Sequence, residues 1–149
     1  MFGLLLFSSC VVNAEDVSKR NGPGNFYDVR YVDCHDGDTC TFLVPWLPPP
    51  FMVLDYRLSG VDTPELSRPK CDAEKALAIK AKTFTVGKLE KAREIDLVNV
   101  DDPGIFGRPT AAVVVDGDSL AYLLVLNGLA VPSKGKRVMD WCAEGGKKE

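Results

Sequence analysis

Apolar and polar residues alternate between residues 27 and 58, which predicts a run of short strands. Tyr27 to Val32 alternates and is rich in residues that favour strands. Asp36-Gly37 predicts a hairpin turn, because glycine accepts a positive φ at little cost, and Thr39 to Val44 follows as the returning strand. Prolines at Pro45 to Pro50 do not fit a central strand and predict an exposed loop. Phe51 to Leu58 is the third expected strand.

The pattern changes to a helical period from Asp72 to Leu89. Its expected apolar face consists of Ala73, Ala76, Leu77, Ala81 and Phe84, with Lys75, Lys80 and Lys82 off that face. Strands are expected at Glu94 to Val100 and Ala111 to Val115. A second helix is expected from Ser119 to Leu126, capped by Asp118 or Ser119 and ended by Asn127-Gly128. This order of elements favours a mainly β protein with helices (α+β), built on a small five-stranded barrel.

Composition narrows the class of protein. The 149 residues suit one domain, and 46% apolar and 26% charged residues are ordinary globular values. A net charge of −3 argues against a protein that holds nucleic acid only by a broad basic surface. However, residues 68–93 are locally basic. The single histidine, His35, excludes sites that need two or more histidines, so any catalysis must use carboxylates, arginines, lysines or thiols.

Residues 1–14 are predicted to be a signal peptide. Leu4 to Val12 is mostly apolar but too short to span a bilayer, and Val12-Asn13-Ala14 has small residues at the −3 and −1 positions of a cleavage site. A buried N-terminal strand is the alternative, and a lipid anchor at Cys10 is a further one. Residues 15–26 are then a flexible leader, 27–131 the folded domain and 132–149 a basic C-terminal tail. We expect a secreted or periplasmic protein.

Cysteine use agrees with export. Cleavage after Ala14 leaves Cys34, Cys40, Cys71 and Cys142, an even number that permits two disulfides in an oxidising compartment. Four cysteines allow three connectivities. We favour Cys71–Cys142, because Cys71 precedes the long helix and Cys142 lies in a tail with little else to anchor it.

Carboxylates and arginines gather at the ends of the expected elements. Asp38 follows the hairpin turn and Asp62 follows a strand, so two carboxylates reach one site from different directions, as a hard cation such as Ca²⁺ requires. Arg57 and Arg108 are bidentate donors suited to phosphate. Glu65 lies three residues after Asp62 and could point at a water held between metal and phosphate.

Each of these segments alone has an ordinary structural interpretation. An Asp-Gly pair is usually only a turn, and Asp116-Gly117-Asp118 repeats it where Asp118 precedes an apolar helix. We therefore interpret Asp118 as a helix cap and not as a metal ligand. Arg57 alone suits a strand surface, and Asp62-Thr63-Pro64 alone suits a loop. Their joint presence favours a functional site.

Together, and in this order, the segments resemble the thermonuclease (staphylococcal nuclease-like) family. The matching motifs are Asp36-Gly37-Asp38-Thr39, Arg57-Leu58-x-Gly60-Val61-Asp62-Thr63-Pro64-Glu65, Phe106-Gly107-Arg108 and Leu124-Val125-x-x-Gly128-Leu129-Ala130. The resemblance covers Tyr27 to Val131. It implies a five-stranded OB-fold barrel with two or three helices and a Ca²⁺-dependent phosphodiesterase that hydrolyses DNA and/or RNA.

The resemblance also implies a role for each matched residue. Asp38 and Asp62 match the family's Ca²⁺-binding aspartates, and Thr63 matches a residue that adds its backbone carbonyl. Glu65 matches the glutamate that acts on the attacking water. Arg57 and Arg108 match the arginines that stabilise the phosphorane-like transition state.

A non-catalytic barrel that binds single-stranded nucleic acid is the alternative. Its candidate stacking residues are Trp46, Phe51, Tyr56 and Phe106, although packing is the favoured interpretation for Phe51 and Tyr56. A pure binder has no use for Asp38, Asp62 and Glu65 where phosphate must pass, because carboxylates without a cation repel it. A purely structural exported domain leaves the neighbouring arginines unexplained. We therefore expect a monomeric Ca²⁺-dependent nuclease with no stable membrane partner.

Overall fold

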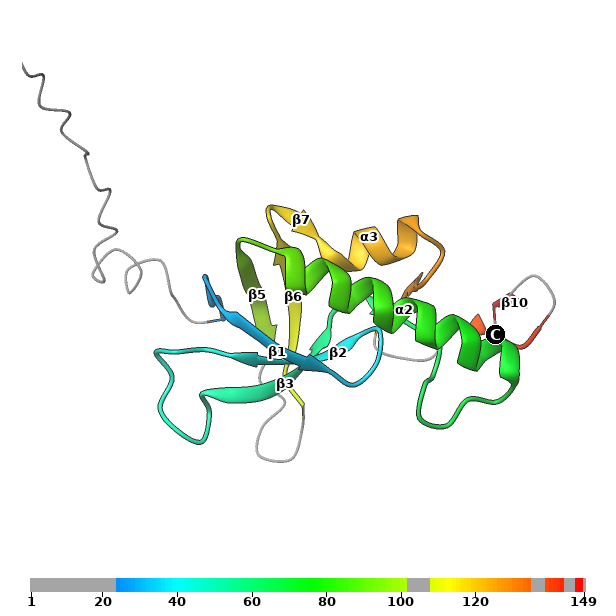
Figure 1. Ribbon diagram of the computed structural model, residues 1–149, viewed down its shortest axis with the longest axis horizontal. Helices are drawn as coiled ribbons and strands as arrows, with labels where there is room; N and C mark the ends of the chain where they lie inside the picture. Colours follow the sequence, from blue (N-terminus) through cyan, green and yellow to red (C-terminus); the bar gives the residue numbers. More distant parts are fainter. Residues whose placement is uncertain (1–23, 102–107, 135–138, 144–146, 149) are drawn as a thin grey trace, which may run out of the picture.

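The protein is described by a computed structural model that covers residues 24–101, 108–134, 139–143 and 147–148. A twisted sheet forms the centre, and two helices lie across one side of it (Figure 1). The main sheet has the strand order β1-β2-β3-β6-β5, and β7 pairs with β6 beside this path. The bounds of these strands are β1 Arg30–Cys34, β2 Thr39–Leu43, β3 Val53–Leu58, β5 Ile95–Asp101, β6 Thr110–Val115 and β7 Asp118–Ser119.

The sheet curls back toward its first strand. β1, β2 and β3 form an antiparallel meander, β3 and β6 pair in parallel, and β6 pairs antiparallel with β5. Just before β1, Phe26 and Leu97 exchange two backbone hydrogen bonds of 2.7 Å, and the Val29 N–H donates to the Ile95 carbonyl at 2.9 Å. These bonds join the segment that leads into β1 to β5, at the other edge of the sheet. The fold is α+β and OB-like, as the element order predicts.

Helix α2 (Asp72–Lys91) covers the sheet, and its buried face coincides with the predicted one only in part. Its buried residues are Glu74, Ala78, Ala81, Thr85 and Leu89, whereas the expected core residues Ala73 and Ala76 are exposed. The prediction is confirmed for Ala81 and Phe84 and was wrong for Ala73 and Ala76, because the buried face includes the polar residues Glu74 and Thr85. Both bond to loops beneath the helix, so apolar periodicity did not reveal the buried face.

Helix α3 (Leu120–Leu126) begins one residue later than predicted. Ser119 is its N-cap, and its Oγ accepts a hydrogen bond from the Tyr122 N–H at 3.3 Å. Asp118 is not the cap. It lies in β7 and pairs with Val115. Gly128, at φ +68°, follows the helix and ends it as predicted.

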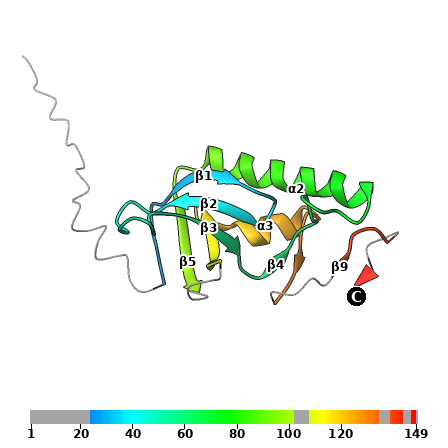
Figure 2. The same ribbon diagram turned by 90° about the horizontal axis from the view of Figure 1, so that it is seen from below.

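Short strands and a disulfide hold the C-terminal part. Strand β4 (Val61–Asp62) pairs with β8 (Val131–Pro132), and β9 (Met139–Asp140) pairs with β10 (Lys147–Lys148). Figure 2 shows β4 and β9 on the opposite side of the molecule from α2. The favoured Cys71–Cys142 bridge is present, and a second disulfide joins Cys34 to Cys40 across the first hairpin. Within the described ranges, no helix is long and apolar enough to cross a membrane.

Candidate catalytic and metal-binding site

The hairpin between β1 and β2 lies directly against α2, and Gly37 makes this approach possible. A Cβ on Gly37 would lie 2.8 Å from Ala81 Cβ and 3.1 Å from Thr63 Cγ2, so no larger residue fits without movement. The Thr85 hydroxyl donates to the Gly37 carbonyl at 2.8 Å. The reason that we gave for this glycine was therefore wrong, because Gly37 is not among the residues with positive φ. Lack of space, not backbone conformation, requires it.

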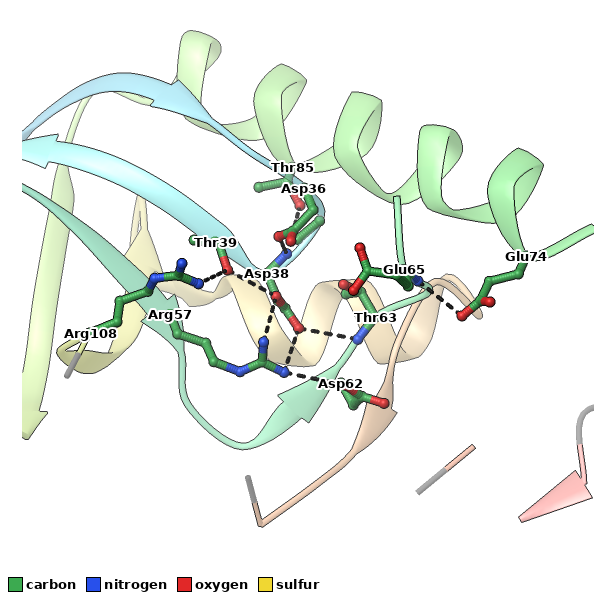
Figure 3. Close-up of polar contacts among 11 residues, drawn as sticks. Asp36, Asp38, Thr39, Arg57, Asp62, Thr63, Glu65, Glu74, Thr85 and Arg108 are labelled. Carbon is green, nitrogen blue, oxygen red and sulfur yellow. Dashed lines mark hydrogen bonds and ion pairs between the residues drawn. The ribbon is translucent and has the colours of Figure 1, made fainter. Parts of the chain in front are cut away.

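Asp38 is held in place next to this glycine (Figure 3). It is 2% exposed, and its carboxylate accepts hydrogen bonds from the Thr39 hydroxyl at 3.2 Å and the Thr63 N–H at 3.3 Å. Thr39 lies in β2 and Thr63 follows β4, so two separate segments orient one carboxylate.

Arg57 joins the two predicted metal-binding carboxylates. Its Nη2 lies 3.0 Å from Asp38 Oδ2 and 3.3 Å from Asp62 Oδ1. The pairing of Thr39 with Arg57 in the β2–β3 ladder places the guanidinium beside the hairpin. Gly60, at φ +83°, then turns the chain so that β4 brings Asp62 back to the same place. Asp62 is 6% exposed, so both acids are removed from bulk water.

These groups line an open cavity of about 350 Å³. Its lining consists of Asp36, Asp38, Arg57, Asp62, Thr63, Pro64 and Glu65. Burial raises the pKa of Asp38 to about 6, although the Arg57 guanidinium beside it acts in the opposite direction. Four carboxylates and one guanidinium leave the cavity with an excess of negative charge, which favours a bound cation.

The loop that bears Glu65 is fastened to the beginning of α2. The Glu65 N–H donates to Glu74 Oε1 at 3.1 Å, and the Lys70 N–H donates to Glu74 Oε2 at 2.7 Å. One carboxylate oxygen of Glu65, Oε1, accepts from the Ser67 N–H at 2.8 Å and the Arg68 N–H at 3.4 Å. The orientation of Glu65 therefore depends on a second, buried glutamate.

Glu74 was missed by sequence reasoning. It is 1% exposed and stands three residues after the helix N-cap Cys71, the position of glutamate in a capping box. The capping-box spacing could have indicated a structural role for Glu74. It could not have indicated the partners of Glu74, because the carboxylate accepts from Glu65 and Lys70, which lie upstream of the cap.

Arg108 reaches the rim of the site from the segment just before β6. The parallel pairing of Arg57 with Thr110, and the bond from the Arg57 N–H to the Pro109 carbonyl at 2.9 Å, bring the two arginines side by side. Arg108 Nη1 lies 3.4 Å from Thr39 Oγ1, to which it donates, while Thr39 bonds to Asp38 (Figure 3). All six predicted site residues thus lie in one region.

Two other groups do not extend the site. Asp28, Glu94 and Asp96 bring carboxylate oxygens within 4.8 Å of one another. However, the Asp28 N–H donates to Asp96 Oδ1, a structural role, and the trio lies outside the cavity.

The aromatic residues of the alternative binding platform are scattered. Tyr56 is buried against Phe42, and Trp46 and Phe51 are exposed on the β2–β3 loop. Phe106 lies outside the described residues.

The fold and site define an OB-like α+β domain with a carboxylate–arginine cavity. A family model of staphylococcal nuclease homologues matches residues 55–140, more than half of the chain. The protein belongs to this nuclease-type family. The match includes Arg57, Asp62, Thr63, Glu65 and Arg108, and it begins after the hairpin that carries Asp38. A search of curated proteins finds no match to this chain.

Proposed function

We propose that the protein is a Ca²⁺-dependent phosphodiesterase that hydrolyses DNA and/or RNA. Membership of a nuclease-type family supports the reaction class and a nucleic-acid substrate. One observation carries the finer proposal: Arg57 bridges two buried carboxylates, Asp38 and Asp62, in the cavity that Glu65 also lines.

The donor set fits Ca²⁺. Asp38 and Asp62 offer carboxylate oxygens, and the Thr63 backbone carbonyl is the third proposed ligand, all of them hard oxygen donors. The raised pKa of Asp38 supports this assignment, because a single arginine does not compensate for the burial of that carboxylate. A bound Ca²⁺ supplies Lewis-acid polarisation of a phosphate oxygen and a position for water.

The arginines bind the phosphate. Arg57 has carboxylate partners in this structure, so it exchanges them for phosphate oxygens when substrate enters. Arg108 is exposed at the rim beside Thr39 and approaches the same phosphate from the β6 side. Two planar guanidinium groups stabilise the extra negative charge of a five-coordinate phosphate better than neutral donors do.

Glu65 accepts the proton of the attacking water. The Ser67 and Arg68 N–H groups hold Oε1, and we assign the proton transfer to Oε2, since Glu65 lines the cavity. The water oxygen forms the new bond to phosphorus, its proton passes to Glu65, and the bond to the leaving alkoxide breaks. The alkoxide then takes a proton from solvent.

The test is cleavage of plasmid DNA and of RNA with Ca²⁺ and with a chelator. Glu65→Gln keeps the shape but loses the base, and is expected to lower the rate by roughly 10²–10⁴. Arg57→Lys and Arg108→Lys keep the charge but lose the planar fork, and each is expected to cost about 10³. Asp118→Asn is the matched control, because Asp118 is exposed in β7 and outside the cavity.

Cleavage that persists after all divalent metal is chelated contradicts this mechanism, as does full activity of Glu65→Gln. The alternative is a non-catalytic barrel that binds single strands. Tight metal-independent binding without cleavage supports that alternative, although the burial of Tyr56 removes one of its stacking residues.

We also propose that the protein is a monomer that is secreted or periplasmic. The disulfides Cys34–Cys40 and Cys71–Cys142 support an oxidising compartment. The predicted signal peptide and Cys10 lie outside the described residues. N-terminal sequencing of the exported protein tests the cleavage after Ala14, and an intact Met1 contradicts it.

A further inference from the structure

The loop between β2 and β3 takes no part in the proposed reaction and has an unusual composition. It comprises Val44, Pro45, Trp46, Leu47, Pro48, Pro49, Pro50, Phe51 and Met52, here called the apolar loop. None of these side chains is charged or carries a hydroxyl, carboxyl or amide group. Nevertheless Trp46 is 38% exposed and Phe51 is 57% exposed.

The apolar loop lies at one end of the β2–β3 hairpin, and the candidate site lies at the other end. Thr39 pairs with Arg57 at the site, whereas Leu43 pairs with Val53 at the beginning of the loop. Figure 1 shows the loop projecting beyond the ends of β2 and β3, at the left of the view. It is therefore a projecting tip that can meet a surface while the cavity stays open.

We propose that the apolar loop inserts into the interfacial region of a lipid bilayer and so holds the protein reversibly at a membrane surface. Tryptophan, with its apolar ring and polar N–H, favours this region. Trp46 and Phe51 are both exposed at the tip, where insertion removes their apolar surface from water.

The backbone of the loop is suited to an apolar environment. Four of its residues are prolines and have no N–H to satisfy. Inside the loop, the Leu47 N–H donates to the Val44 carbonyl at 3.1 Å and the Phe51 N–H donates to the Pro48 carbonyl at 2.8 Å. Insertion therefore leaves few backbone N–H groups without a partner, which lowers one part of the cost of placing irregular chain in an apolar environment.

Size and charge favour a bilayer over other occupants. A stable protein interface buries roughly 800 Å² and 20–30 residues on each side, whereas the apolar loop has nine residues and projects from the fold. Nucleic acid needs cations for its phosphates, and the loop has none. A bilayer requires neither a matching pocket nor charge.

The experiment uses Trp46 fluorescence in the full chain with Trp141→Phe, which leaves Trp46 as the sole tryptophan. Phosphatidylcholine vesicles are expected to shift its emission to shorter wavelength, and brominated acyl chains to quench it. Phe51→Ser in this background is expected to weaken partitioning about tenfold. Leu126→Ser, the same kind of change at an exposed residue of α3, is the matched control and leaves partitioning unchanged.

Because the loop is uncharged, the shift is expected to persist at about 1 M NaCl, where electrostatic attraction is screened. Vesicle binding without quenching of Trp46 overturns the proposal, because another segment then makes the contact. Binding that requires anionic lipid and disappears in salt assigns the membrane contact to basic side chains. That result also overturns the proposal. An emission shift that depends on protein concentration without vesicles identifies a second copy as the occupant. Nuclease activity, measured separately, tests the proposed function independently.

Discussion

At the scale of single residues, the position of Asp38 depends on the space that Gly37 leaves. The hairpin tip touches Ala81 and receives the Thr85 hydroxyl bond, so the glycine and its contacts set the distance between hairpin and helix. A displacement of this tip moves Asp38 relative to Arg57, and hence changes the cavity.

Gly37→Ala is expected to lower the free energy of unfolding by about 1–3 kcal/mol, because its Cβ overlaps Ala81 and Thr63. Urea denaturation measures this loss. The matched control is Gly87→Ala in α2, where the added Cβ meets nothing within 4 Å and is expected to stabilise the helix by about 0.5–1 kcal/mol. Equal stability of Gly37→Ala and the parent contradicts the packing argument.

Asp55 makes a pH-dependent contribution to the stability of the fold. The Thr41 hydroxyl bond lowers the pKa of Asp55, and His35 and Arg108 lower it further against the effect of burial. A carboxylate with a depressed folded-state pKa stabilises the fold above its unfolded pKa of about 4, and this contribution disappears as pH falls through the folded value.

Asp55→Asn is therefore expected to destabilise the protein near pH 7 and to have a smaller effect near pH 3. The difference should stay under about 1 kcal/mol, because the side chain is 39% exposed. Urea denaturation of parent and variant at the two pH values measures it. A difference that is the same at both pH values excludes a contribution from ionisation.

At the scale of elements, the first turn of α2 organises the loop that bears Glu65. Glu74 receives the Glu65 and Lys70 N–H groups, and Cys71, just before the helix, is bridged to Cys142. Helix α2 therefore positions Glu65, the proposed general base, although no residue of the helix lines the cavity.

Glu74→Gln replaces one acceptor oxygen by an amide NH₂ that faces the Lys70 N–H. We expect kcat to fall about tenfold or more, because small displacements of a catalytic group are costly. Ca²⁺ affinity should change little, since Glu74 contacts neither Asp38 nor Asp62 through the bonds described. Steady-state kinetics and Ca²⁺ titration separate the two effects. Glu90→Gln, an exposed glutamate of the same helix, is the control, and equal losses in both variants contradict a positioning role.

At the scale of the whole molecule, the cavity exists only in the assembled fold. The β1–β2 hairpin, β3, β4 and the loop after β4 all contribute charged groups that meet there. A ligand that binds this cavity and not the unfolded chain must therefore stabilise the entire domain.

Ca²⁺ at about 100 times its dissociation constant is expected to add roughly 2.7 kcal/mol and to raise Tm by several degrees. Asp62→Asn should lose most of this increase, because it removes one proposed ligand charge. Thermal unfolding with Ca²⁺ and with a chelator measures it, with Asp118→Asn as the variant that keeps the full response. A shift of the same size in Asp62→Asn places the Ca²⁺ elsewhere.

Most elements and their order were predictable from local pattern. Alternation and helical period depend on neighbouring residues, so the three-strand meander, α2 and α3 were found, while β1 and β3 begin two or three residues later than predicted. The disulfide Cys71–Cys142 was favoured correctly. Residue types at element ends also indicated the candidate site, because Ca²⁺ and phosphate require particular donors.

Contacts between distant segments were decided only by the tertiary structure. The bond from Thr85 to Gly37 joins residues 48 positions apart, and the Thr63 N–H reaches Asp38 across 25 positions. The sequence by itself determined the strand and helix periods, the family resemblance and the chemical types at the site. Packing decided which helix face is buried, why Gly37 is a glycine, and that Glu74 supports Glu65. These outcomes depend on the space and hydrogen-bond partners that elements offer one another after they assemble, which no local pattern encodes.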